Sequence, residues 1–449
     1  MKPVLLCLLP FFLAACQSKK QEAKNEIAKL SDEALLDTVQ ARSIKYFTAG
    51  AEPTSGLGRE RYHADNVYPQ NDATTVTSGG SGFGVMALLA GIERKFISRE
   101  EGFRRLEKIV KFLETADRFH GAWPHWWYGE TGKVKPFGTK DNGGDLVETS
   151  YMLQGLLCVR QYFKDGNENE KALAQRIDKL WREVDFDWYR NGQNVLYWHW
   201  SPDYAWEMNF PVRGYNECLI MYVLAASSPL HGIEAKVYHE GWAEGGKLKS
   251  PHQGLGYDLS MRYQGNPENG APLFWSQYSF LGLNPKGLKD EYADYLKENT
   301  NHTLINYTWC VNNPKKYKGY GKDSWGLTAS YSVKGYAAHA PNDRGDRGVI
   351  SPTAALSSFP YTPTESMAAM KHWYYDLNDK AWGVFGFYDA FSETENWFPK
   401  RYLAIDQGPI AVMIENYRTG LFWNLFMSCP EVQAGLKKLG FESPPVSPK

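Results

Sequence analysis

The sequence lacks a strong charge of one sign and, beyond its N-terminus, any long hydrophobic run. The 449 residues carry a formal net charge of −1, which argues against a nucleic acid or a strongly charged polymer as the partner. After residue 16, no stretch approaches the roughly 18 apolar residues that a membrane-spanning helix needs. We therefore expect the body of the chain to be soluble and to contact a membrane only through an anchor.

Cysteines and the signature motifs of several enzyme classes are also scarce. Beyond the N-terminal segment, the cysteines are scattered in apolar contexts without the pairing typical of a metal site: Cys158, Cys218, Cys310 and Cys429. We expect buried free thiols, and one disulfide is the alternative in an oxidising compartment. The sequence contains no His-Glu-x-x-His zinc motif, no Gly-x-Ser-x-Gly elbow and no phosphate-binding loop. No metal and no organic cofactor is implied.

The N-terminus has the pattern of an export signal. Met1-Lys2 gives a positive start, and a short apolar run follows it and ends in Leu13-Ala14-Ala15-Cys16. This ending resembles the lipobox of bacterial lipoproteins, in which the cysteine is lipidated; a plain secretory signal is the alternative. We expect a lipoprotein signal peptide over residues 1–16 that ends at lipidated Cys16, and a flexible tether over 17–30. The protein would then be anchored in the outer membrane and face the periplasm or the cell surface.

Helical periodicity dominates the rest of the chain. The apolar spacing predicts helices over 31–47, 84–96, 98–113, 145–163, 169–184, 214–226, 233–242, 289–305, 364–377, 406–417 and 430–439, with shorter ones near 275–283, 325–333 and 353–358. No run of alternating strands rivals them, so the pattern predicts an all-α fold. Paired helices with alternating short and long connections favour one α/α toroid over residues 31–449. Two helical domains side by side are the alternative.

Three long connections, 122–144, 187–213 and 335–352, are rich in Trp, Tyr, Gly, Asp and His. Loops of this length inside a compact domain usually carry function. Aromatic residues make up 15% of the chain, and a sugar-binding cleft needs such rings because the apolar faces of pyranoses stack on them. We expect stacking platforms and hydroxyl contacts for a sugar from Trp126, Trp127, Trp198, His199, Trp200, Trp206, Tyr336, His339 and Arg344.

Acidic residues cluster at the starts of two predicted helices. In DNGGDLVETSYMLQGLL, Asp145 and Glu148 have the spacing of a capping box, and Asp141 shares their face if the helix starts earlier. In GYNECLIMYVL, Glu217 lies in a predicted first turn, where the helix dipole favours a carboxylate. Capping alone explains each acid. Their repetition beside aromatic loops favours glycoside hydrolysis, in which one carboxyl protonates the leaving oxygen and a second activates water or attacks the anomeric carbon.

Several long phrases resemble the glycoamylase-like domain of bacteria. They include GGSGFGVMALLAGIER, DNGGDLVETSYMLQGLL, GYNECLIMYVLAASSP and IDQGPIAVMIENYRTGLFW, and the resemblance covers about residues 32–440. Characterised members similar to this chain are endo-β-1,2-glucanases with an (α/α)6 barrel, which hydrolyse β-1,2-glucan to sophorooligosaccharides with inversion at the anomeric carbon. The resemblance implies essential acids at Asp141, Asp145, Glu148 and Glu217.

These expectations combine into an inverting endo-β-1,2-glucanase with an (α/α)6 barrel. We expect Glu217 to be the general acid and one of Asp141, Asp145 and Glu148 to be the base, with the acid and base carboxyls roughly 6.5–9.5 Å apart. The partner would be a glucan, and the protein a monomer. The alternatives are a glucoamylase-like exo-acting glucosidase on another glucan, a non-catalytic glycan-binding lipoprotein, and a lyase or transglycosylase on the same toroid.

Overall fold

The computed structural model describes residues 29–67, 70–265 and 268–444. The predicted signal peptide, Cys16 and nearly all of the predicted tether lie outside the described residues. No helix within the described ranges is long and apolar enough to cross a membrane. The α-helices of the described residues are α1 (Asp32–Tyr46), α2 (Ser78–Glu93), α3 (Arg99–Thr115), α4 (Leu146–Phe163), α5 (Glu168–Arg182), α6 (Leu219–Ser227), α7 (Tyr295–Asn312), α8 (Pro352–Leu356), α9 (Pro363–His372), α10 (Ala404–Arg418), α11 (Leu421–Met427) and α12 (Pro430–Lys438).

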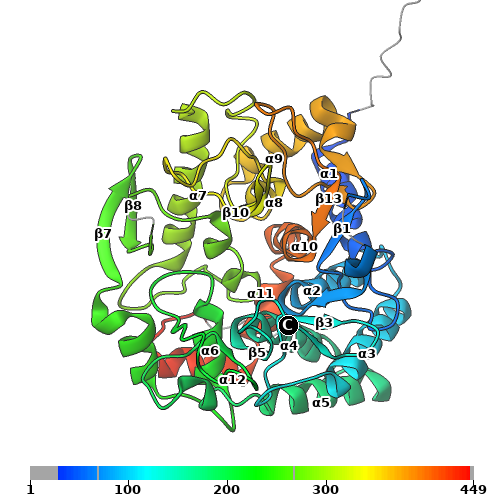
Figure 1. Cartoon of the computed structure of the whole chain (residues 1–449), viewed down its shortest axis with the longest axis vertical. Helices are drawn as coiled ribbons and strands as arrows, with labels where there is room; N and C mark the ends of the chain where they lie inside the picture. Colours follow the sequence, from blue (N-terminus) through cyan, green and yellow to red (C-terminus); the bar gives the residue numbers. More distant parts are fainter. Residues whose placement is uncertain (1–28, 68–69, 266–267, 445–449) are drawn as a thin grey trace, which may run out of the picture.

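The helices form an inner and an outer layer. In the inner layer α2 packs against both α4 and α10, α4 also contacts α6, and α10 also contacts α8. Two short 3-10 turns, η5 (Leu273–Ser276) and η6 (Ser279–Leu281), complete this layer between α6 and α10. Figure 1 shows α2, α4 and α10 near the middle of the molecule and α3 and α5 at its periphery. The predicted all-α (α/α)6 barrel is confirmed.

The inner helices are buried on nearly every side, whereas an outer helix such as α3 buries one face. Nearly all residues of α2 and α4 are buried, and glycines allow the two backbones to meet. A Cβ on Gly155 would lie 2.1 Å from the carbonyl oxygen of Gly82. In the outer helix α3, burial is confined to one stripe that includes Leu106, Ile109, Val110 and Leu113, as expected of an amphipathic helix on a core.

Short strands tie the loops together at the ends of the inner helices. The pair that bears on the site is β5–β6, in which Asp145 is opposite His199 and Gly144 is opposite Trp200. The strands are β1 (Arg61–His63), β2 (Thr75–Thr77), β3 (Trp126–Tyr128), β4 (Val134–Lys135), β5 (Gly144–Asp145), β6 (His199–Trp200), β7 (Lys249–Gly254), β8 (Tyr257–Met261), β9 (Ala329–Ser332), β10 (Gly335–Ala338), β11 (Trp382–Gly383), β12 (Gly386–Phe387) and β13 (Arg401–Leu403).

Some predicted helices are wrong or displaced. The segment 325–333 contains strand β9, which pairs with β10 across a tight turn, because its short apolar run fits a buried strand as well as a helix. Helices α6 and α7 begin at Leu219 and Tyr295, later than expected, and α11 was not predicted. The expectation of buried free thiols is confirmed for Cys158, Cys218, Cys310 and Cys429.

Candidate active site

A cavity of about 350 Å³ opens where α4, the segment before α6 and strands β1 and β3 come together. Glu148 and Tyr151 reach it from α4, and Glu217 reaches it from the residues just before α6. Its aromatic walls include Trp126, Phe137, Trp198, Tyr331 and Tyr336. Two of the acids predicted from separate sequence motifs therefore face one ring-lined cavity.

Asp145 is fully buried, and its carboxylate oxygens accept hydrogen bonds from three groups. As the N-cap of α4, it accepts at Oδ1 from the main-chain N–H of Glu148, at 2.9 Å. Oδ2 accepts from Nε1 of Trp198, at 2.9 Å, and lies 3.1 Å from Nδ1 of His125. Through these contacts Asp145 holds the start of α4 and the side chains of Trp198 and His125 in place.

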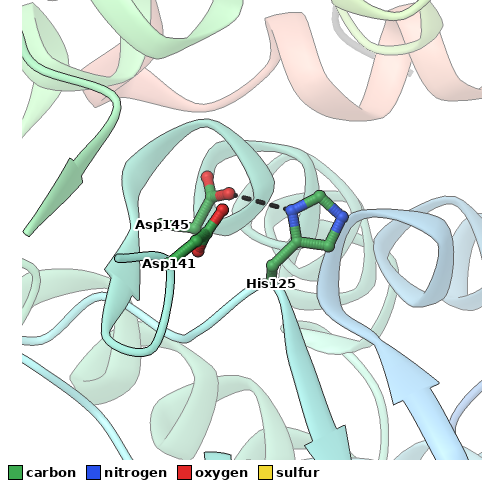
Figure 2. Close-up of side chains that lie close together, drawn as sticks. All are labelled: His125, Asp141 and Asp145. Atoms are coloured by element: carbon green, nitrogen blue, oxygen red, sulfur yellow. Dashed lines mark hydrogen bonds and ion pairs between the residues drawn. The ribbon is translucent and has the colours of Figure 1, made fainter. Parts of the chain in front are cut away.

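His125 lies between this carboxylate and the cavity. Figure 2 shows its ring directed at Asp145, with Asp141 beside that carboxylate. Burial by itself lowers the pKa of His125, but the nearby carboxylates of Glu148 and Asp145 outweigh it and raise that pKa to about 10. Ligand atoms of His125, Asp141 and Asp145 all lie within 4.8 Å of one another. When its imidazole is protonated, His125 forms an ion pair with Asp145, 3.1 Å away.

Glu148 is held by a contact that the capping-box pattern did not predict. Its side chain does not return to Asp145; Oε2 accepts a 2.8 Å hydrogen bond from the main-chain N–H of Gly79, in the first turn of α2. Burial raises the pKa of Glu148 to about 7, with the charge of Asp145 adding to the rise and that of His125 opposing it. The carboxyl is thus placed at the cavity and poised to exchange a proton near neutral pH.

Asp141 is buried and is not among the described residues that line the cavity. Its Oδ1 is 3.2 Å from Nε2 of His199, a nitrogen that also accepts a hydrogen bond from the main-chain N–H of Gly143. Burial and then the charge of Asp145 raise the pKa of Asp141 to about 7. Because Nε2 has one lone pair, it accepts from Gly143 while His199 is unprotonated there, and it can donate to Asp141 only when that nitrogen carries a proton.

The sequence predicted Glu217 in the first turn of a helix. In the structure it precedes α6, which begins at Leu219. Its carbonyl oxygen accepts a 2.6 Å hydrogen bond from Oγ of Ser279, and the hydroxyl of Tyr151 donates to the same oxygen at 3.5 Å. These contacts fix the main chain, and its side chain reaches the cavity. Burial raises the pKa of Glu217 to about 7, so the carboxyl can carry a proton close to neutral pH.

The predicted stacking platforms divide into two groups. Trp126 and Trp198 line the cavity. Trp127, the next residue along β3, is 0% exposed and donates through Nε1 to the carbonyl of Asp117; its predicted role is wrong, because successive strand residues face opposite sides. Trp200 and Trp206 pack instead around Trp188, with ring centroids 6.1 and 6.3 Å from it.

Predicted polar contacts to the sugar are corrected in the same way. Tyr336 lines the cavity and is exposed. The side chain of His199 is buried by the β5–β6 pairing, and His339 is 0% exposed, so neither ring can reach a ligand in the cavity as the structure stands. Arg344 is exposed on a loop and is absent from the described residues that form the cavity wall.

Several residues of the cavity wall were not predicted from the sequence. Glu60 and Arg61 reach the cavity at the start of β1, and His125 reaches it just before β3. His125 belongs to the aromatic connection 122–144, and its place in that connection could have marked it. Glu60 stands in an unremarkable polar stretch, and its main-chain hydrogen bonds to Thr75 and Ala404 hold it at the cavity.

Comparison with known proteins gives one consistent result. The Glycoamylase family model matches residues 209–430. The chain is 46% identical over 426 residues to the exo β-1,2-glucooligosaccharide sophorohydrolase (non-reducing end) of Parabacteroides distasonis, a match that covers 91% of this chain and 58% of that protein. The chain thus spans well under two thirds of the length of that curated relative.

Solved structures agree. The endo-β-1,2-glucanase of Chitinophaga pinensis, in a complex with sophorotriose and glucose, is 70% identical, with a TM-score of 0.92 over 93% of this chain and 100% of that one. The endo-β-1,2-glucanase of Talaromyces funiculosus, in a complex with sophorose, is 11% identical with a TM-score of 0.66, over 90% of this chain and 89% of that one. This last likeness shows a shared fold alone.

Proposed function

The chain belongs to the glycoamylase-like family that includes the endo-β-1,2-glucanase of Chitinophaga pinensis, and we propose that it hydrolyses β-1,2-glucan by endo cleavage. The observation that carries the proposal is the meeting of Glu148 and Glu217 at one aromatic-walled cavity. Glycoside hydrolysis needs two carboxyls beside the scissile bond, and aromatic walls suit a sugar. Endo action is favoured because the endo-acting relative is 70% identical, against 46% for the exo-acting one.

Glu217 is the proposed general acid. Its pKa of about 7 leaves a substantial fraction protonated near neutral pH. As the bond from the anomeric carbon to the glycosidic oxygen breaks, the carboxyl gives its proton to that oxygen, and the leaving sugar departs as an alcohol.

Glu148 is the proposed general base. Among the acids predicted for this role, Glu148 lines the cavity, whereas the oxygens of Asp145 are engaged by N–H donors. As a carboxylate, Glu148 takes a proton from water while the water oxygen attacks the anomeric carbon from the face opposite the leaving group. The product then has the α configuration, which is inversion of the β linkage.

The test is sugar release from β-1,2-glucan by the wild type and by Glu217→Gln and Glu148→Gln. Because acid–base catalysis contributes roughly 10²- to 10⁴-fold, each variant should lose that factor in kcat. Glu207→Gln is the matched control, since Glu207 is exposed and pairs with Lys140 at 3.3 Å. Full activity in both site variants would reject the assignment, and a non-catalytic glycan-binding protein would release no sugar at all.

The products separate the remaining alternatives. Endo cleavage should lower the mean chain length of the polymer early and yield a range of sophorooligosaccharides, whereas an exo-acting relative would release one short product from chain ends. NMR of the newly formed reducing end should first show the α-anomer. A β-anomer would indicate a retaining or transglycosylating enzyme, and an unsaturated product would indicate a lyase.

We also propose that the protein is a monomeric lipoprotein of the outer membrane. The support is the Leu13-Ala14-Ala15-Cys16 sequence. Wild-type protein should fractionate with membranes, and Cys16→Ala should abolish incorporation of labelled fatty acid; incorporation into the variant would contradict the anchor. Light scattering of the protein from residue 31 onward should give the mass of a single chain.

A further inference from the structure

Glu60 occupies a fixed position in the cavity wall. Its main-chain N–H donates to the carbonyl of Thr75 at 2.9 Å, and its carbonyl accepts from the N–H of Ala404, in the first turn of α10, at 3.1 Å. The residue is thus held between strand β2 and helix α10, and its side chain lines the cavity. The point at which this side chain enters the cavity is therefore fixed by the main chain.

This carboxylate has capacity left for hydrogen bonds. Its contact in the protein is Arg61, whose Nη2 lies 3.9 Å from Oε1, within ion-pair range but too far for a hydrogen bond. The Arg61 guanidinium also lies over the ring of Trp126, 5.5 Å from its centroid. Within the described ranges, no donor is within hydrogen-bond distance of either Glu60 oxygen, in contrast to Asp145.

The side chain of Glu60 is nevertheless mostly withdrawn from water, with 14% of its surface exposed. A sugar that fills the cavity would remove the remaining water. Leaving a carboxylate without a hydrogen-bond donor in such a place is unfavourable, so we expect the ligand to supply donors. The donors on a glucan are hydroxyl groups, and a carboxylate can accept from adjacent hydroxyls with its two oxygens.

The linkage of the glucan decides which adjacent hydroxyls are free. An interior unit of a β-1,2-glucan uses its oxygens 1 and 2 in linkages, so the neighbouring 3- and 4-hydroxyls both remain. A β-1,3- or β-1,4-linked unit has lost one of this pair. We propose that Glu60 contributes to the specificity for the glycosidic linkage, by accepting hydrogen bonds from the 3- and 4-hydroxyl groups of one bound glucosyl unit. This role rests on the proposed hydrolysis of β-1,2-glucan.

The test measures binding without turnover. Calorimetry compares Glu217→Gln with the double variant Glu217→Gln/Glu60→Ala, using sophorotriose and analogues that each lack one 3- or 4-hydroxyl. Because hydrogen bonds to a charged group are strong, sophorotriose should bind the double variant roughly 10- to 100-fold more weakly. At least one deoxy analogue should bind Glu217→Gln more weakly than sophorotriose does, by a similar factor. The double variant should bind this analogue no more weakly than it binds sophorotriose.

Controls separate this role from a structural one. In the otherwise wild-type enzyme, Glu60→Gln should raise KM for β-1,2-glucan with a smaller change in kcat, and its thermal unfolding should match that of the wild type. Glu130→Gln, at an exposed position in the β3–β4 turn, should leave KM unchanged.

Two results would overturn the proposal for Glu60 alone. One is equal affinity of Glu217→Gln and the double variant for sophorotriose. The other is that removing a hydroxyl from the ligand weakens binding by the same factor in both variants, for every deoxy analogue. Failure of the wild type to hydrolyse β-1,2-glucan would overturn the proposed function and this role together.

Discussion

The main-chain N–H of Gly79 donates a 2.8 Å hydrogen bond to Oε2 of Glu148 and so joins the first turn of α2 to the first turn of α4. A side chain at position 79 would destroy this contact. A Cβ on Gly79 would lie 2.3 Å from Oε2 of Glu148 and 2.9 Å from Cδ2 of Tyr151. The absence of a side chain at Gly79 is therefore needed for the hydrogen bond that positions the carboxyl of the proposed base, Glu148.

Gly79→Ala should consequently lower kcat far more than it lowers stability. The clash falls on the movable end of Glu148, so we expect at least a tenfold loss of kcat and a cost of about 1–3 kcal/mol in unfolding free energy. Steady-state kinetics and urea unfolding measure the two effects. Gly321→Ala is the control, because a Cβ there meets nothing within 4 Å. Equal kcat for Gly79→Ala and the wild type would contradict the role of this contact.

The pH profile of hydrolysis should be bell-shaped and centred near pH 7. Glu217 must be protonated to act as the acid, and with a pKa of about 7 it loses this form as pH rises. Glu148 must be ionised to act as the base, and with a pKa of about 7 it loses that form as pH falls. A plot of kcat/KM against pH reports both limbs. A flat plateau from pH 5 to pH 9 would exclude this pair.

The raised pKa of Glu217 should also make the unfolding free energy depend on pH. Burial raises the pKa of Glu217 from 4.5 to about 7 in the folded protein, so the folded state binds the proton more tightly than the unfolded state. This contribution is fully present below pH 4.5 and is lost as pH rises through 7. Above pH 8, the unfolding free energy of Glu217→Gln, measured with urea, should therefore exceed that of the wild type by up to about 3 kcal/mol. The difference between the two proteins should shrink toward pH 4.5, and one that does not change with pH would contradict this account.

His125 should set the acid limb of the activity profile. Its positive charge lowers the pKa of Glu148, so His125→Gln should move that limb toward higher pH, on the order of one unit. The kcat/KM profile of the variant measures the shift. His372→Gln should leave the profile in place, because His372 pairs with Asp376 on an exposed helix end. An unmoved acid limb in His125→Gln would show that the imidazolium does not act on the base.

Much of the fold could be predicted because helix signals are local. Ser98 caps α3 by accepting from the N–H of Glu101. Asp145 caps α4 in the same manner, as its capping-box spacing to Glu148 indicated. Those signals need only a few neighbouring residues. The start of α6 was placed too early, because Gly214 to Cys218 form an irregular approach that is held by contacts such as Ser279 to the carbonyl of Glu217.

The site was harder to predict, because it depends on contacts between segments far apart in sequence. Glu148 has a local capping partner in the sequence, yet its carboxyl binds Gly79 on another helix. Glu60 enters the cavity wall through its main-chain bonds to Thr75 and Ala404. His199 is turned inward by the pairing of β5 with β6. No spacing of residues along the chain encodes such pairings.

Trp126 and Trp127 provide the sharpest contrast between binding and packing. Both belong to β3, but Trp126 lines the cavity whereas Trp127 is 0% exposed and packs edge-on against Phe112. Trp126→Ala should therefore raise KM for β-1,2-glucan while the unfolding free energy changes little. Trp127→Ala should cost about 3–5 kcal/mol of unfolding free energy, because it leaves a large void in the core. Urea unfolding and steady-state kinetics of the two variants check the contrast. If Trp127→Ala raised KM at unchanged stability, the inward orientation of this ring would be contradicted, and the register of β3 against β2 with it.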